Sequence, residues 1–278
     1  MSNLITRGRA IQNLNDRATT SNENATLDVL IPAVSRAIEN YCWRTFAITS
    51  YDELYPGHNR LELVLRHYPI ASVERLAYAP SPVMRVTNNS ASNQRATVKV
   101  TSTGLELIRG ASGTSTTNTI NFSDQATLSA LATAVTALGN GWSASVIDSV
   151  HNLRASADLR ALQGAFHAKD VDAELKLHTQ ELSSFHVDAD RGLLTRGDGA
   201  GFDGGLHSWR IVYRAGYSSV PDEIQEACAQ WVAQLFWLTK RDPGLASEAI
   251  PGSVSRTPTR DMPTTVKILL GPYRNWRV

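Results

Sequence analysis

The chain has few of the residues on which several common classes of protein depend. It contains only two cysteines, Cys42 and Cys228, among 278 residues, so a disulfide framework is not expected and a reducing compartment is the default. Charged residues make up only 19% of the chain, and the formal net charge is +1. A dedicated DNA-binding protein would carry a basic excess, because neutralised phosphates supply most of its affinity. The composition therefore argues against a protein built to grip DNA.

Long apolar segments and known catalytic motifs are also missing. No apolar run reaches the ~18 residues that a membrane-spanning helix needs, and the N-terminal region has no apolar signal core. The seven histidines form no His-Glu-x-x-His arrangement, and Cys-x-x-Cys, Walker and Gly-x-Ser-x-Gly motifs do not occur. The sequence predicts a protein made in the cytoplasm, without a membrane partner, cofactor, metal site or catalytic residues.

Two short motifs match known binding patterns, but their surroundings in the sequence do not support binding. Residues 199–204 match the dinucleotide pattern Gly-x-Gly-x-x-Gly, but they precede a predicted strand and not the helix whose N-terminus would hold a pyrophosphate. Residues 196–198 spell Arg-Gly-Asp, the integrin-type tripeptide, which three residues specify only weakly. A tight turn is the simpler interpretation.

The two ends of the chain differ in composition from its middle. Residues 25–80 and 183–275 are rich in Trp, Tyr, Leu, Ile and Arg, whereas residues 87–150 are rich in Thr, Ser, Ala and Asn. A surface loop accepts a folded insert at modest entropic cost. We therefore expect a mobile arm (1–24), a discontinuous core domain (25–82 and 183–240), an inserted domain (83–182), a linker (241–262) and a C-terminal docking helix (263–278).

The outer segments predict helices around a small sheet. Apolar residues at helical spacing indicate a first helix over 25–41, capped by Asn24 or Thr26, with Pro32 near its first turns. A long helix over 221–240 and a last helix from 263 complete the helical part. Alternating or β-branched segments predict strands over 46–55, 61–65, 73–78, 185–187, 192–194 and 209–214.

The inserted segment predicts a small domain of its own. Three strands, over 96–100, 105–108 and 119–122, precede a helix capped by Ser123 or Asp124. A returning strand over 142–147 gives the order β-β-β-α-β, and another strand is expected over 175–178. The predicted fold class is α+β: a helical bundle with a small antiparallel β-sheet, plus the inserted α+β domain.

The long helix carries a wider apolar stripe than a small domain needs. That stripe either packs against a neighbouring subunit or forms an ordinary covered core, and the spacing does not decide between them. The candidate intersubunit residues are Ile224, Trp231, Val232, Leu235 and Phe236.

The C-terminal segment combines aromatic and basic residues. Tyr273, Arg274, Trp276 and Arg277 follow a short apolar helix, which is typical of a docking element. The alternative is that this helix folds back on its own domain.

Four groups of segments follow one another in a fixed order and cover a little over half of the chain. They are 30–33 with 37–41 and 44–46, then 65–70 with 72–73, then 212–217 with 220–221 and 227–228, and finally 262–263 with 269–270 and 273–274. In this order they resemble the head–tail connector (adaptor, or head-completion) proteins of long-tailed bacteriophages. Family members usually have a short connection where this chain has about a hundred residues, so the resemblance leaves the partner of the insert open.

The resemblance implies a structural virion protein of the neck. Such proteins form a ring, typically twelve-fold, which joins the portal to the next neck or tail component and extends the DNA channel. DNA would pass through the lumen without sequence-specific binding, which the near-neutral charge favours. The family's C-terminal segment commonly docks on the portal, which points here to Pro263, Val266, Leu269, Leu270, Tyr273, Arg274, Trp276 and Arg277.

Two alternatives remain at this stage. A tail-side terminator or completion ring belongs to the same class at a different position, although the docking helix favours the portal side. A cell-wall-directed hydrolase belongs to another class and needs a nucleophile with its base, or a carboxylate pair. No residue spacing in the sequence supports the hydrolase.

Overall fold

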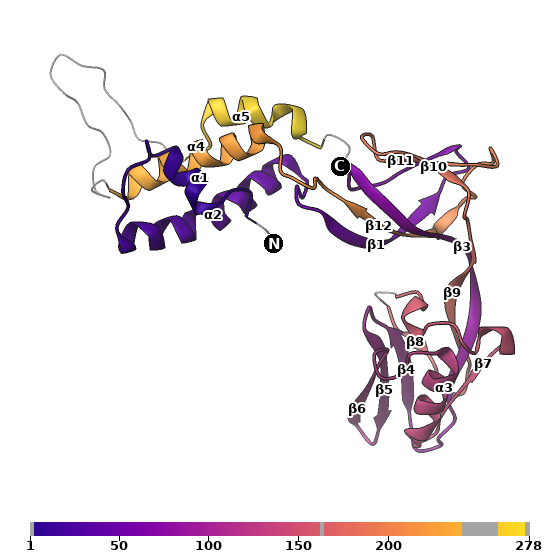
Figure 1. Ribbon diagram of the computed structural model, residues 1–278. Coiled ribbons are helices and arrows are strands. Elements are labelled where there is room, and N and C mark those ends of the chain that lie inside the picture. Colours follow the sequence, from indigo (N-terminus) through magenta and orange to yellow (C-terminus); the bar gives the residue numbers. More distant parts are fainter. Residues whose placement is uncertain (1–2, 162–163, 241–260, 276–278) are drawn as a thin grey trace, which may run out of the picture.

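The computed structural model describes residues 3–161, 164–240 and 261–275. The protein is α+β: helices pack together at one end, antiparallel sheets continue from them, and a third unit projects from the far side of the sheets (Figure 1). Each of the three parts has its own cluster of buried apolar side chains.

Four helices form the helical layer: α1 (Arg7–Gln12), α2 (Ser21–Cys42), α4 (Asp222–Thr239) and α5 (Thr264–Leu270). Their apolar stripes face one another, so α2 contributes Leu27 and Ile38 to the same core as Ile224 and Val266. A capping box begins α2, because the Thr20 hydroxyl accepts from the Glu23 N–H and the Glu23 carboxylate accepts from the Thr20 N–H. Burial of these stripes, more than helix propensity, stabilises the layer.

The prediction of a mobile arm over residues 1–24 is wrong for residues 3–24, which the structure describes. Thr6 caps α1, with its hydroxyl accepting from the Arg9 N–H at 3.3 Å, and Leu4 and Leu14 are buried in the helical core. Because polar residues separate these few apolar ones, the composition of the segment does not predict that it is buried. The helix α2 also begins at Ser21, earlier than expected, so Pro32 lies well inside it.

The central sheet has the strand order β1 (Thr49–Gly57), β12 (Gly205–Ala215), β3 (Ile70–Asn88) and β7 (Trp142–Val146), and β9 (Ala173–Glu181) also pairs with β3. A smaller antiparallel sheet has the order β10 (Phe185–Asp188), β11 (Leu193–Arg196) and β2 (Glu62–Val64). Trp209, Tyr213 and Phe202 fill the core between them.

The predicted boundary between residues 82 and 83 falls inside a strand. Instead of ending at residue 78, β3 continues to Asn88, and β9 pairs with it from Ala77 to Val86. Pro80 and Pro82 obscure this strand in the sequence, because proline donates no ladder hydrogen bond. The outer sheet and the inserted unit therefore share two continuous strands.

The inserted unit packs one helix, α3 (Leu128–Ala137), among strands. Its own sheet has the order β6 (Thr114–Asn121), β5 (Gly104–Ala111), β4 (Arg95–Val100) and β8 (Phe166–His167). Thr127 caps α3, not Ser123 or Asp124. The chain passes through β4, β5, β6, α3 and β7 in the predicted order, but β7 pairs with β3 instead of returning to this sheet. Two short 3₁₀ turns, η1 (Ser149–His151) and η2 (Ser156–Asp158), follow β7.

Candidate functional site

The helical layer and the sheets meet at the C-terminal end of α2. Trp43 takes a left-handed conformation there (φ 53°), and its N–H and that of Arg44 donate to the last carbonyls of the helix. This turn directs Arg44 back toward the sheets. The Trp43 side chain stays 59% exposed.

Arg44 is the centre of a cluster that we call the Arg44 junction: Arg44, Phe46, Tyr68, Tyr217, Tyr273 and Asn275. Its guanidinium lies 4.3 Å from the centroid of the Tyr68 ring and 5.5 Å from that of Tyr217. The same group donates to the backbone carbonyl of Tyr68 and, at 3.4 Å, to that of Tyr273. One side chain therefore joins three distant segments of the chain.

Aromatic rings surround this guanidinium. Phe46 is fully buried and packs against Tyr217 and Tyr273, with ring centroids 6.4 and 6.3 Å away. The Tyr217 N–H donates to the Phe46 carbonyl at 2.8 Å. Gly216 allows this approach, because a Cβ on it, at φ 121°, would lie 2.5 Å from the Ala47 carbonyl oxygen.

The C-terminal segment closes the junction from the other side. The Asn275 N–H donates to the Cys42 carbonyl at 2.8 Å, and the Tyr68 hydroxyl donates to the Asn275 side chain at 3.3 Å. The Tyr273 hydroxyl donates to Glu223 at 3.0 Å, and burial raises the pKa of Tyr273. Arg274 lies over the Tyr41 ring at 5.2 Å. These contacts fix the chain end onto the helical layer.

The structure thus places most of the proposed portal-docking residues against their own domain. Val266 and Leu270 are fully buried, Leu269 packs against the same core, and Pro263 precedes the first residue of α5. An α5 side chain that stays available is Ile268, which is 69% exposed. Trp276 and Arg277 lie outside the described residues.

The proposed intersubunit stripe is likewise covered inside the chain. Ile224, Val232 and Phe236 have no exposed area and Trp231 is 9% exposed, while Leu235 packs against the same core. Within the chain these side chains therefore form a covered core, which is one of the two alternatives that the spacing left open.

The most enzyme-like group of side chains surrounds Glu53 on β1. The carboxylate accepts from the hydroxyls of Tyr55 (2.6 Å) and Tyr213 (2.8 Å), and His67 lies 3.7 Å away. Burial opposes ionisation of Glu53, but the hydrogen bonds from His67, Tyr55 and Tyr213 prevail and lower its pKa to about 2. Such a carboxylate is a poor base at neutral pH. Its geometry fits a fixed anion that holds two tyrosines in the core.

The two short motifs are structural. Residues 199–204 lead into β12, and the Asn59 side chain accepts from the Gly204 N–H at 2.7 Å. Arg196 pairs with Asp198 at 2.5 Å within one turn. Both loops are therefore held by contacts within the chain.

The described residues contain neither a metal-binding cluster nor a membrane-spanning helix. No three or more His, Cys, Asp or Glu side chains come together there in a way that could hold a metal ion. Across the same ranges, no helix has the length and apolar character needed to cross a membrane.

The chain is similar in structure to a solved neck protein, while its sequence matches no known family. No protein-family model matches the chain, and no curated protein matches it. A solved structure described as the neck of an empty GTA particle, computed with C6 symmetry, is similar over 99% of this chain and 91% of the other, with 13% identity and a TM-score of 0.40. At that identity and TM-score, the likeness does not establish a shared fold.

Proposed function

We propose that this chain is a structural protein of a phage neck. It forms an oligomeric ring that joins the portal to the next neck or tail component, and DNA passes through the lumen. The observation that carries the proposal is the Arg44 junction. The segments that resemble the connector family lie far apart in sequence, yet Arg44, Tyr68, Tyr217 and Tyr273 meet in one cluster.

A shared junction supports the resemblance because it gives the weak motifs one physical reason to occur together. Tyr68 supplies both a ring and a carbonyl to Arg44, and Gly216 permits the close approach of two segments. Segments that matched by chance would have no reason to meet. The charge also fits, since a wall with little net charge lets DNA slide.

The subunit contact would come from the outer face of α2. Val29 on α2 is 69% exposed, and Trp43, which directly follows the helix, is 59% exposed. Trp43 also retains the left-handed backbone, which costs a residue with a side chain roughly 1 kcal/mol or more. A ring contact would bury this surface and offset that cost.

Sedimentation velocity of the chain with the portal protein of the phage that encodes it tests this assignment. The variants Val29→Asp and Trp43→Ser should abolish the ring while leaving the far-ultraviolet circular dichroism unchanged. Leu153→Asp is the matched control, because Leu153 is 86% exposed on the inserted unit. Rings that form equally well with the two α2 variants would exclude this face as the subunit contact.

A further inference from the structure

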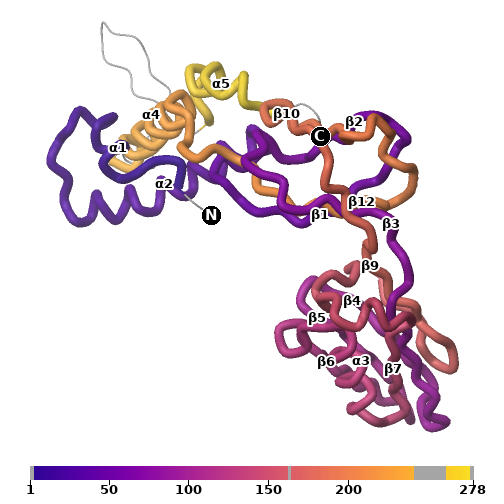
Figure 2. The backbone as a smooth tube through the Cα atoms, turned by 45° about the vertical axis from the view of Figure 1, so that its right-hand side comes forward, coloured from indigo at the N-terminus to yellow at the C-terminus, as the bar shows by residue number. Residues whose placement is uncertain are grey.

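Two strands carry the chain between the central sheet and the inserted unit. In both views β3 and β9 run side by side as a narrow ribbon between these parts (Figures 1 and 2). Ala79 has φ 55°, Pro80 and Pro82 donate no ladder hydrogen bonds, and the register shifts between Pro82 and Met84. The ribbon is therefore irregular where it leaves the central sheet. By itself it does not fix the angle between the central sheet and the inserted unit.

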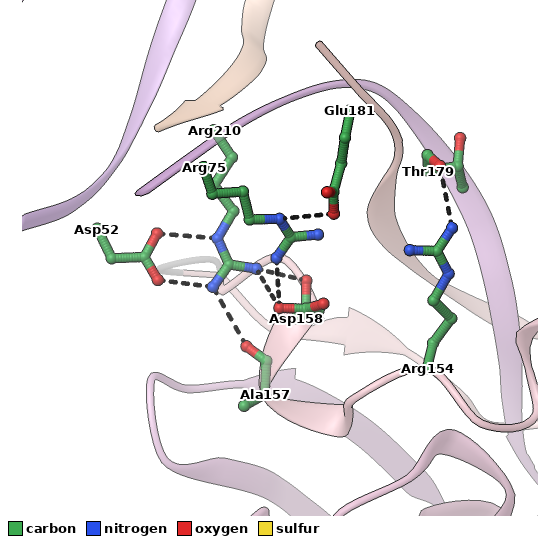
Figure 3. Close-up of polar contacts among 8 residues, drawn as sticks. All are labelled: Asp52, Arg75, Arg154, Ala157, Asp158, Thr179, Glu181 and Arg210. Atoms are coloured by element: carbon green, nitrogen blue, oxygen red, sulfur yellow. Dashed lines mark hydrogen bonds and ion pairs between the residues drawn. The ribbon is translucent and has the colours of Figure 1, made fainter. Parts of the chain in front are cut away.

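A second connection spans the same gap without covalent continuity. Asp158 in η2 of the inserted unit pairs with Arg75 of β3, with Nη1 and Oδ1 2.6 Å apart (Figure 3). Arg210 of β12 donates to the backbone carbonyls of Asp158 at 2.7 Å and Ala157 at 3.3 Å. We call Arg75, Asp158 and Arg210 the interdomain clasp.

The central sheet holds both arginines ready for this contact. Arg210 makes a bidentate pair with Asp52, at 2.8 and 2.6 Å, and Arg75 pairs with Glu181 at 3.0 Å. The side chains of the clasp are largely covered, with 17%, 22% and 12% exposed for Arg75, Asp158 and Arg210. Ion pairs in such sites are less screened by salt than surface pairs.

Asp158 in turn moves with the inserted unit. The loop that carries it is tied to the start of α3, where the Leu128 N–H donates to the Arg154 carbonyl and the Ser156 N–H to the Ala126 carbonyl, each at 3.0 Å. A cavity of about 480 Å³ lies beside the clasp, between this loop and the central sheet. Arg160 of the same loop also lies 3.0 Å from the Nδ1 atom of His207 on β12. Contact across that gap therefore depends on polar groups, those of the clasp and the Arg160–His207 pair, more than on close apolar packing.

We infer that Asp158 is a positioning residue that fixes the direction in which the inserted unit projects. The β3–β9 ribbon acts as the hinge, and the clasp locks it at one angle. This inference goes beyond the neck role and does not depend on it, because it concerns two parts of one chain. In a ring, the same clasp would give every subunit's insert the same orientation.

Distance measurements between spin labels test the inference on the full chain. Labels at Val29→Cys on α2 and Thr117→Cys on β6 span the hinge, and both positions are exposed. Cys42 and Cys228 are buried, which leaves the introduced cysteines as the reactive ones. Asp158→Asn removes the negative charge that pairs with Arg75 and Arg210 but leaves the Arg210 hydrogen bonds to the Asp158 and Ala157 carbonyls. In this background we expect the distance distribution to become measurably broader. Asp170→Asn is the matched control, because its carboxylate is on the same unit and 65% exposed, and it should leave the width unchanged.

Two further variants separate pivoting from unfolding. A label pair at Val29 and Leu61, both outside the inserted unit, should keep its width when Asp158 is changed. The double variant Arg75→Gln with Asp158→Asn should be no broader than Asp158→Asn alone, since both act through one contact. An unchanged width across the hinge in Asp158→Asn overturns the inference, and so does equal broadening of the Val29–Leu61 pair.

Discussion

Replacing Arg44 with methionine should destabilise the helical layer more than any exposed arginine would. The variant keeps the apolar stem but loses two hydrogen bonds from a charged group and the contact with the Tyr68 ring. Charged hydrogen bonds contribute roughly 1.5–3 kcal/mol each and a cation–π contact roughly 0.5–2 kcal/mol, and the contributions are not additive. We expect the free energy of unfolding to fall by about 3.5 kcal/mol, the low end of the sum of those ranges.

Urea unfolding followed by far-ultraviolet circular dichroism measures this loss, because α1, α2, α4 and α5 all belong to the core that Arg44 closes. Arg44→Lys should recover part of the loss, since lysine keeps the charge without the planar fork. Arg7→Met is the control: Arg7 pairs with Asp28 while 47% exposed, and such pairs contribute about 1 kcal/mol or less. If Arg44→Met were no less stable than Arg7→Met, the junction would not hold the layers together.

Three further predictions use the same unfolding assay. Leu14→Ala should lower the free energy of unfolding by about 3 kcal/mol, because Leu14 is 1% exposed. An unchanged stability would mean that residues 3–24 do not pack on the helical layer. Gly216→Ala should cost about 2 kcal/mol or more through its positive φ and the clash with Ala47, and a neutral result would mean that the backbone relaxes there. For Glu53, the pKa of the folded state lies below its usual 4.5, so its stabilisation is present above pH 4.5 and is lost as the pH falls toward 2. The advantage of wild type over Glu53→Gln should therefore shrink by up to about 3 kcal/mol across that range, and a constant difference would contradict the assigned hydrogen bonds.

Long periodic segments made the main helices predictable from the sequence. The helix predicted over 25–41 is present as α2, and the helix over 221–240 is present as α4, because each buries one apolar stripe against the other. The strand over 209–214 likewise falls within β12, where Trp209, Ile211 and Tyr213 alternate into the core. In these segments the local pattern and the tertiary packing agree.

Features that depend on distant partners were not predictable. The continuation of β3 past Pro80 is stabilised by β9, which lies about a hundred residues later. The short α1 has too few apolar residues for a periodic signal, and its burial depends on α2 and α4. The same holds for the clasp, because the sequence around Asp158 does not indicate that Arg75 and Arg210 are its partners.

The partner of an apolar stripe is hard to predict for a related reason. An apolar stripe on a helix indicates that a partner covers it, but the sequence does not say whether that partner is the same chain. For Ile224, Val232 and Phe236 the partner is α2 and the other helices of the layer. The aromatic and basic residues near the C-terminus were identified as an anchoring group, yet Tyr273 and Arg274 anchor the chain to its own domain.

Electron microscopy of the purified chain mixed with the portal protein of the phage that encodes it tests the central claim most directly. The account predicts a ring stacked on one end of the portal, which is lost with Trp43→Ser and retained with Leu153→Asp. Bare portals, with this chain left monomeric or bound to tail tubes instead, would contradict a role at the portal.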